Sequence, residues 1–257
     1  MVKAANAGPA LIISRREFDA AIFDLDGVLT DTAHLHAAAW KAVFDDFLQR
    51  RASRGGEPFR PFDIEADYLA YVDGRPREDG IRTFLASRNL DLPEGAASDL
   101  EDADTVQALG RRKAGLFLRL LHRGFAPAPG AVALLDRLRK AAIAIAVATS
   151  SRNGAVILKA AALDRLIDLR VDGIVASQLS LPGKPDPALF LEATRRLGAT
   201  PARAILFEDA LAGVAAGRRG NFRCVVGIDR HGQAEALRRH GADLVIESLE
   251  QVEVSMG

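Results

Sequence analysis

The sequence predicts an α/β protein in which a parallel sheet is interrupted by a long helical segment. From residue 127 onward, short apolar runs alternate with helical patterns, which is typical of a doubly wound parallel sheet. Between the first apolar run, at 20–23, and the next, at 143–148, residues 33–125 contain only helical patterns. The expected architecture is therefore a Rossmann-like core, formed by residues 1–32 and 126–257, with an inserted α-helical domain at 33–125.

Each element is assigned from its local pattern. The helices have apolar residues on one face and are separated by glycine and proline signals. The predicted strands are the apolar runs 20–23, 143–148, 173–175, 204–207, 224–226 and 243–246. The predicted helices are 33–48, 64–71, 79–88, 98–122, 131–140, a segment from 153, 187–197, a segment from 211, and 234–240. Residues 1–15 are expected to be a loosely ordered extension.

The bulk composition narrows the function classes. The 257 residues hold 34 Lys and Arg and 34 Asp and Glu, so the net charge suggests neither nucleic acid nor a membrane as a partner. The lone Cys224 excludes an internal disulfide and suits a reducing cytosol. The longest apolar stretch, 141–148, is too short to cross a bilayer, and the first fifteen residues are a poor signal peptide. We expect a cytoplasmic protein that is a monomer or a weak dimer.

Asp24 and Asp26 directly follow the first predicted strand. Two carboxylates one residue apart at the end of a strand point to the same side of the sheet. Gly27 permits the tight turn that follows them. An acidic pair in a loop is usually solvated, but two carboxylates at the end of a buried strand are costly unless a cation compensates their charge. This motif therefore favours a metal site.

Polar residues also follow the next three predicted strands. They are the hydroxyl run 149–151, Lys184 within the segment 183–187, and the pair Glu208 and Asp209. Taken singly, these would be a helix start, a surface lysine and a solvated acidic pair. Because the carboxyl ends of parallel strands meet at one edge of the sheet, the set is expected to converge there. Carboxylates suit Mg²⁺, while lysine and hydroxyl groups bind phosphate oxygens, so the combination predicts a metal and phosphate site.

These four segments resemble the four motifs of the haloacid dehalogenase-like phosphotransferases. The resemblance implies that Asp24 is the nucleophile that becomes an aspartyl phosphate and that Asp26 is the general acid/base. It implies that Thr149 and Lys184 hold the transferring phosphoryl group. The implied Mg²⁺ ligands are the carboxylates of Asp24, Glu208 and Asp209 and the backbone carbonyl of Asp26.

Two features of the inserted domain, which the resemblance identifies as a cap, are similar to the β-phosphoglucomutase family. They are the run Thr32-x-x-x-His36-x-x-x-Trp40 and the loop Gly74-x-x-Arg77-Glu-Asp. By this resemblance Thr32 and His36 modulate Asp26, and Arg77 binds a second phosphate. The other implied substrate-binding residues are Trp40, Gly74, Ser150, Ser151, Arg152 and Asn153. Two ordinary alternatives stay open: Trp40 packs inside the cap, and Arg77 pairs with a neighbouring acidic residue.

The resemblance implies an Mg²⁺-dependent mutase that interconverts β-D-glucose 1-phosphate and glucose 6-phosphate through a 1,6-bisphosphate. The alternative is a phosphatase with the same core that acts on small sugar phosphates. A catalytically silent binding protein is the third possibility. Two features depart from the family pattern: the segment 50–58 has no counterpart in it, and Thr149-Ser150 replaces the usual Ser-Ala.

Overall fold

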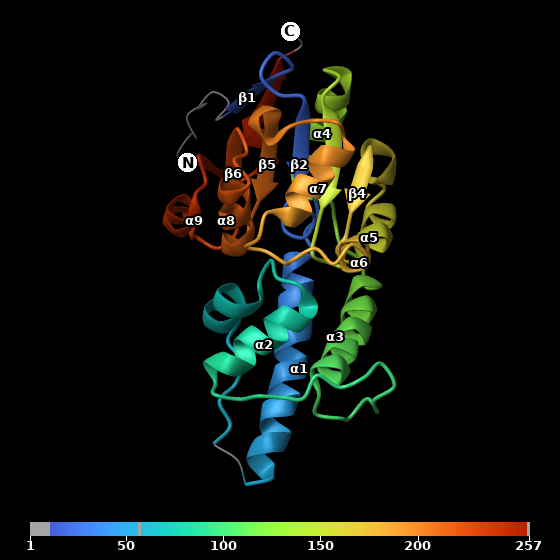
Figure 1. Ribbon diagram of the computed structural model, residues 1–257, viewed down its shortest axis with the longest axis vertical. Helices are drawn as coiled ribbons and strands as arrows, with labels where there is room; N and C mark the ends of the chain where they lie inside the picture. The colour runs from blue at the N-terminus through green and yellow to red at the C-terminus, as the bar shows by residue number, and fades with distance from the viewer. Residues whose placement is uncertain (1–10, 56–57, 256–257) are drawn as a thin grey trace, which may run out of the picture. The chain divides into compact units, whose positions relative to one another are not determined.

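The computed structural model describes residues 11–55 and 58–255, which form two units (Figure 1). The core unit contains the described residues up to Asp31 and from Pro127 onward. The cap unit contains the described residues of Thr32–Ala126. Each unit has its own cluster of buried apolar side chains.

A parallel sheet of six strands lies at the centre of the described part of the core unit. Its strand order is β4-β3-β2-β5-β6-β7, which confirms the doubly wound sheet and the insertion of the helical segment between two neighbouring strands. The strands are β2 (Ala20–Phe23), β3 (Ala144–Ala148), β4 (Leu169–Val171), β5 (Ala204–Glu208), β6 (Cys224–Ile228) and β7 (Leu244–Ile246). Strand β2 pairs with β3 on one side and β5 on the other, and none of its residues is exposed.

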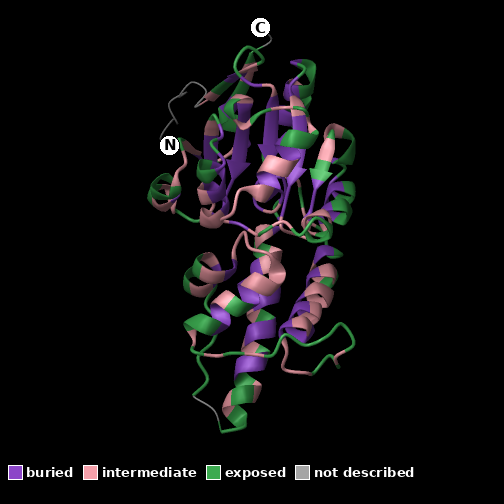
Figure 2. Ribbon diagram, viewed as in Figure 1, coloured by how far each residue is buried: buried purple, intermediate pink, exposed green. Residues whose placement is uncertain are grey.

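Helices cover this sheet (Figure 2). They are α4 (Ala131–Lys140), α5 (Gly154–Ala160), α6 (Gly173–Gln178), α7 (Ala188–Arg196), α8 (Leu211–Arg219) and α9 (Ala234–His240), with short turns η2 (Asp164–Leu166), η3 (Pro201–Arg203) and η4 (Leu249–Gln251). Ile22 and Leu206 share one apolar cluster with Phe190 of α7 and Val214 of α8. The side chains of Phe23 and Phe207 stack with ring centroids 4.6 Å apart.

The segment 173–175, predicted as a strand, is instead the start of helix α6. The strand of this region, β4, lies at Leu169–Val171. Asp172 explains the difference, because its carboxylate accepts hydrogen bonds from the backbone N–H groups of Ile174 and Val175. This cap begins a helix where two β-branched side chains favour a strand.

The expected loose extension is corrected in part. Residues Leu11–Ser14 form strand β1, which pairs in parallel with β8 (Val252–Ser255) in a separate two-stranded sheet. Ile13 is fully buried, so this strand contributes to the apolar interior. Residues 1–10, to which the rest of that expectation applies, lie outside the described residues.

The cap unit is helical, and no strand occurs in its described residues. Its elements are α1 (Ala33–Ser53), the π-helix η1 (Ile64–Val72), α2 (Arg77–Ser87) and α3 (Val106–Leu121). Helix α3 begins at Val106 rather than at the predicted residue 98, because the Thr105 hydroxyl accepts the Ala108 N–H and caps the helix there. Rings of Phe44, Phe62 and Phe84, with centroids 4.4 to 5.0 Å apart, form the aromatic centre of the unit.

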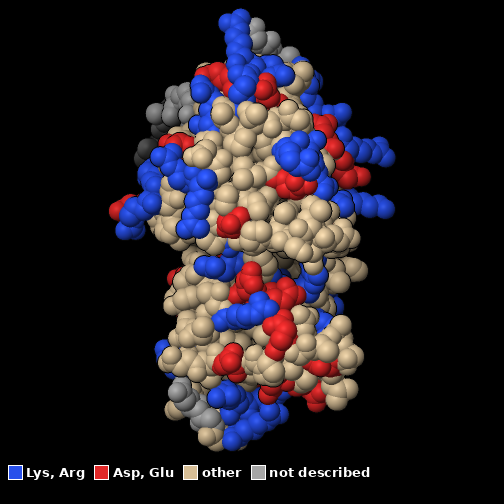
Figure 3. All heavy atoms as spheres, in the orientation of Figure 1, with Lys and Arg blue, Asp and Glu red and all other residues tan. Residues whose placement is uncertain are grey.

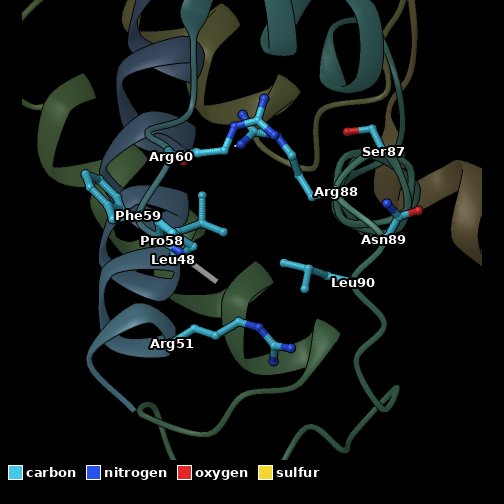
Figure 4. A pocket seen from close by; sticks show the side chains of 9 residues that line it. All are labelled: Leu48, Arg51, Pro58, Phe59, Arg60, Ser87, Arg88, Asn89 and Leu90. Carbon is cyan, nitrogen blue, oxygen red and sulfur yellow. Dashed lines mark hydrogen bonds between the residues drawn. The ribbon is translucent and has the colours of Figure 1, made fainter. Parts of the chain in front are cut away.

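The segment 50–58 lies at one end of the cap unit, and its residues 56–57 are outside the described part of the chain. Some of its described residues line a cavity of about 90 Å³ (Figure 4). The cavity is lined by Leu48, Arg51, Pro58, Phe59, Arg60, Ser87, Arg88, Asn89 and Leu90. Arg88 is held by an ion pair with Asp67 at 2.6 Å, so this arginine already has a structural partner.

Positive and negative side chains are both present across the face drawn in Figure 3, as the balanced composition leads one to expect. Among the helices that the structure describes, none combines the length and apolar character that a bilayer crossing needs.

Cys224 begins strand β6 and is partly buried. Burial, together with the charge of Asp243, raises the pKa of its thiol to about 11, although Arg223 opposes the shift.

Candidate active site

The turn after β2 holds Asp24 and Asp26. The backbone N–H of Asp24 donates to the Phe207 carbonyl at 2.9 Å, which continues the sheet by one residue. Gly27 then adopts a φ of +83°, a conformation that side chains with a Cβ resist, and its N–H donates to the Thr30 carbonyl at 2.8 Å. Asp26 forms a bridge with Thr30. The two aspartates are thus presented from a short, internally bonded turn at the carboxyl end of the central strand.

Lys184 is buried beside the first aspartate. Its Nζ donates to Asp24 Oδ1 at 2.8 Å and to Glu208 Oε2 at 2.6 Å. The ammonium group also lies 4.8 Å from the centroid of the Phe190 ring. A buried lysine is costly unless it is paired, and two carboxylates provide that compensation here.

Glu208 ends strand β5 and is fully buried. Its Oε1 accepts hydrogen bonds from the backbone N–H groups of Asp209 and Ala210, at 3.2 and 3.0 Å. Gly213 of α8 leaves the space for this side chain, because a Cβ at that position would collide with the Glu208 carboxylate. The donors on both of its oxygens fix the rotamer of Glu208.

Three carboxylates form a buried acidic cluster in the described residues. Ligand oxygens of Asp24, Glu208 and Asp209 all lie within 4.8 Å of one another. Hard divalent cations such as Mg²⁺ prefer oxygen ligands of this kind. Lys184 supplies one positive charge against three carboxylates, so the donor set fits a cation that balances the remaining charge. The Asp26 carboxylate is not a member of the cluster, and the predicted contribution of Asp26 is its carbonyl.

The acidic surroundings shift the proton affinity of the site. Burial, together with the charges of Glu208 and Asp26, raises the pKa of Asp24 to about 8, although the charge of Lys184 opposes the shift. Burial on its own would lower the pKa of Lys184, but Asp24 and Glu208 raise it above its usual value. In the absence of a cation, Asp24 therefore holds a proton more tightly than an ordinary aspartate.

The hydroxyl-rich segment after β3 folds into a compact loop. The Thr149 hydroxyl accepts the Ser151 N–H at 3.1 Å, and the Ser151 hydroxyl accepts the Asn153 N–H at 3.2 Å. Gly173 of α6 packs closely behind the loop, since a Cβ there would approach the Ser150 carbonyl to 2.5 Å. Thr149 is buried, Ser150, Ser151 and Asn153 are half-buried, and Arg152 is exposed.

The cap unit holds the remaining predicted residues. Thr32 directly precedes α1, is fully buried, and accepts the His36 N–H with its carbonyl. His36 Nδ1 lies 2.6 Å from Nζ of Lys113, a residue the sequence did not single out. The Lys113 ammonium lies between aromatic rings, 5.2 Å from the Trp40 centroid and 4.9 Å from that of Phe117. Since an ammonium group can only donate, it directs Nδ1 to accept and leaves the proton of a neutral ring on Nε2.

Trp40 packs in the cap interior, stacked on Phe44 with centroids 5.0 Å apart. Gly74 has a φ of +71° in the loop that leads to α2, and Arg77 is the first residue of that helix. The aliphatic part of Arg77 passes close to Gly110 of α3, where a Cβ would be only 3.0 Å from Arg77 Cδ. The predicted residues thus fall into two sets, one within the core unit and one within the cap unit.

Comparison with known proteins identifies the family of this chain. A family model described as haloacid dehalogenase-like hydrolase matches residues 18–221, so the chain belongs to that family. A curated protein of Mycobacterium bovis named beta-phosphoglucomutase is 50% identical over 237 residues, covering 91% of this chain and 90% of its own. Within the haloacid dehalogenase-like enzymes, the chain is a member of the β-phosphoglucomutase family.

Two further relatives show the range of the group. A crystal structure of beta-phosphoglucomutase from Clostridium difficile matches with a TM-score of 0.69 and 25% identity, covering 91% of this chain and 92% of that one. Hexitol phosphatase A of Escherichia coli is 30% identical over 235 residues, covering 91% of this chain and 93% of its own. The relatives therefore include both a mutase and a phosphatase by name.

Proposed function

We propose that the protein is an Mg²⁺-dependent phosphoglycosyl mutase that interconverts β-D-glucose 1-phosphate and glucose 6-phosphate. The observation that carries the proposal is Asp24, buried at the end of the central strand and bonded to Lys184, in a chain half identical to a named beta-phosphoglucomutase. Similarity to a named phosphatase supports the alternative, a hydrolase for small sugar phosphates.

In the proposed reaction an oxygen of the Asp24 carboxylate attacks one phosphorus atom of the 1,6-bisphosphate. The bond between phosphorus and the sugar oxygen breaks, and Asp26 donates a proton to that leaving oxygen. The aspartyl phosphate then transfers its phosphoryl group to a hydroxyl of a second sugar phosphate, and Asp26 takes up the proton of that hydroxyl. A 1,6-bisphosphate forms again, and after it turns around, Asp24 accepts its other phosphoryl group and the isomeric monophosphate is released.

The core unit supplies the groups that make attack by an anion on an anion feasible. Lys184 places positive charge beside Asp24, and the Thr149 hydroxyl binds a phosphoryl oxygen in this proposal. Asp24, Glu208, Asp209 and the Asp26 carbonyl would hold Mg²⁺, which neutralises phosphoryl oxygens when it is bound. Both roles lower the repulsion that the nucleophile meets.

The cap residues are proposed to select the substrate. A mutase must hold one phosphate that reacts and one that does not, and the guanidinium group of Arg77 suits the second task. Thr32 and His36 would modulate Asp26. The further proposed contacts of the sugar and its second phosphate are Trp40, Gly74, Ser150, Ser151, Arg152 and Asn153.

An assay separates the mutase from the phosphatase. β-D-glucose 1-phosphate, with a trace of the 1,6-bisphosphate, is followed by coupled detection of glucose 6-phosphate and of inorganic phosphate. The mutase proposal expects glucose 6-phosphate as the main product and no turnover by Asp24→Asn. Release of inorganic phosphate alone would replace the mutase with the phosphatase.

Arg77→Ala tests the second phosphate site. Loss of a charge-assisted contact of roughly 1.5–3 kcal/mol predicts about a ten- to hundred-fold lower kcat/KM in the mutase assay. Arg75→Ala, in the same loop, is the matched control and should stay near the parent. Equal activity of Arg77→Ala and the control would remove Arg77 from the proposed site.

A further inference from the structure

We propose that Arg230 is a positioning residue that fixes the turn carrying Asp26, and that its effect is confined to reactions whose leaving group needs a proton. The inference rests on the proposed function in one respect, the role of Asp26 as general acid. It concerns the core unit alone, where every contact on which it depends is found. Neither the sequence motifs nor the comparisons assign a role to this arginine.

Arg230 follows strand β6 and reaches across to the turn after β2. Its Nε donates to the Gly27 carbonyl at 2.7 Å, and its Nη1 makes a weaker contact with the Glu247 carbonyl at 3.4 Å. Its Nη2 is buried and has no hydrogen-bond partner among the described residues. The guanidinium group of Arg230 therefore bonds two main-chain carbonyls and, among the described residues, no carboxylate.

The bond from Arg230 to the Gly27 carbonyl adds to the contacts that hold this turn, among them the bond from the Ala128 N–H to the Leu29 carbonyl at 2.9 Å. Inside the turn, the Gly27 N–H bonds the Thr30 carbonyl, and the Thr30 hydroxyl donates to the Leu25 carbonyl at 3.1 Å. Arg230 holds the carbonyl of Gly27, the residue next to Asp26, from the segment after strand β6. Asp24, in contrast, is fixed by its own bond to β5 through the Phe207 carbonyl. Loss of the arginine should therefore disturb Asp26 more than Asp24.

That difference has a chemical signature. A sugar alkoxide is strongly basic and leaves only if Asp26 delivers a proton, whereas p-nitrophenolate leaves without one. Attack by Asp24 is common to both substrates. A misplaced acid therefore slows the sugar phosphate and spares p-nitrophenyl phosphate, and displacement of a catalytic group by about 1 Å can cost roughly a hundred-fold in rate.

The test compares Arg230→Met, which keeps the aliphatic stem and removes the donors, with Arg230→Lys, which keeps one donor. Initial rates of Asp24 phosphorylation are measured with β-D-glucose 1,6-bisphosphate and with p-nitrophenyl phosphate, together with KM and the melting temperature. For Arg230→Met we expect about a ten- to hundred-fold lower kcat with the bisphosphate, little change in KM, and less than about a three-fold change with p-nitrophenyl phosphate. Arg230→Lys should lie between Arg230→Met and the parent.

Two control variants show which part of the proposal is wrong if the expected result is not seen. Arg139→Met removes another arginine that donates to a main-chain carbonyl, that of Arg165, and should leave both rates unchanged. Asp26→Asn should show the same preference for p-nitrophenyl phosphate. Equal losses with both substrates, or none with either, would overturn the role of Arg230. If Asp26→Asn itself shows no preference, the proposed role of Asp26 fails instead. If Arg230→Met does not fold, the rates of Arg230→Lys with the two substrates are compared instead.

Discussion

Glu208 has a donor on each carboxylate oxygen, and the space it occupies exists only because residue 213 is glycine. In a helix, alanine is normally more favourable than glycine by about 1 kcal/mol. At position 213 the added Cβ would instead meet the buried carboxylate. The side chain that holds Lys184 would have to move.

We predict that Gly213→Ala lowers both the melting temperature and the affinity for Mg²⁺, measured by thermal unfolding with a metal titration. Gly115→Ala in α3 is the matched control, since the nearest atom to its Cβ is 3.6 Å away. The control should be neutral or slightly stabilising. A Gly213→Ala protein as stable as this control would mean that the Glu208 pocket adapts freely.

The raised pKa of Asp24, about 8 against a usual 3.8, predicts how metal binding depends on pH. The folded, metal-free protein holds this proton more tightly than the unfolded chain, so its contribution to stability is full below about pH 4 and is lost as pH rises towards 8. A cation binds the carboxylate and must displace the proton.

Affinity for Mg²⁺ should therefore rise by up to about ten-fold per pH unit between pH 5.5 and 8 and then level off. The measurement is the Mg²⁺-induced increase of the melting temperature in buffers across that range. Asp24→Asn, which cannot titrate, should give a much flatter profile. A parent profile as flat as that of the variant would contradict the shift.

Asp24 and Glu208 of the candidate core site could be predicted because they lie at the carboxyl ends of strands β2 and β5. Lys184 was assigned from the predicted strand at 173–175, which is the start of α6, but its Nζ does bond the carboxylates of both other residues. Lys113 was missed, since a lysine within a helix normally lies at the surface. Its burial depends on His36, which is 77 residues away, and local sequence patterns do not contain that contact. One local indication that Lys113 is buried is that Leu109 and Phe117, four residues to either side on the helix, are apolar, and both are buried in the structure.

At the scale of elements, the strand prediction failed where one side chain outweighed the propensity of its neighbours. Ile174 and Val175 favour a strand, but the Asp172 carboxylate bonds their N–H groups and begins α6. The pairing of β1 with β8 was also missed, because it joins segments from opposite ends of the described chain. The other strands of the six-stranded sheet and most of the core helices were predicted correctly. Their apolar patterns are continuous, and turn residues separate one element from the next.

Helix α3 offers a prediction at this scale through Gly110. Alanine at this position should favour the helix itself by about 1 kcal/mol, but its Cβ would press on Arg77 Cδ from 3.0 Å. We expect Gly110→Ala to keep or raise the melting temperature and to increase KM for the sugar phosphate several-fold in the mutase assay. Gly115→Ala, in the same helix, should leave KM unchanged. An unaltered KM in Gly110→Ala would show that Arg77 does not depend on this contact.

At the scale of the whole molecule, each unit has its own buried apolar cluster, and the acidic cluster belongs to the core unit alone. Mg²⁺ should therefore slow hydrogen exchange around β2, β5 and the start of α8, and leave the aromatic centre of the cap unit unchanged. Exchange measured by mass spectrometry with and without Mg²⁺ tests this. In Asp24→Asn, which lacks one of the proposed metal ligands, Mg²⁺ should slow the exchange less. Equal protection of both units would show that the metal couples them.

The partly buried thiol of Cys224, with its pKa raised to about 11, has a practical consequence. At neutral pH only a very small fraction is thiolate, so maleimide dyes should react with it slowly. As the chain has no other cysteine, an engineered pair, one on each unit, would carry nearly all of the label without removal of the native residue. Energy transfer between the two dyes would then follow in real time whether sugar phosphates change the separation of the units.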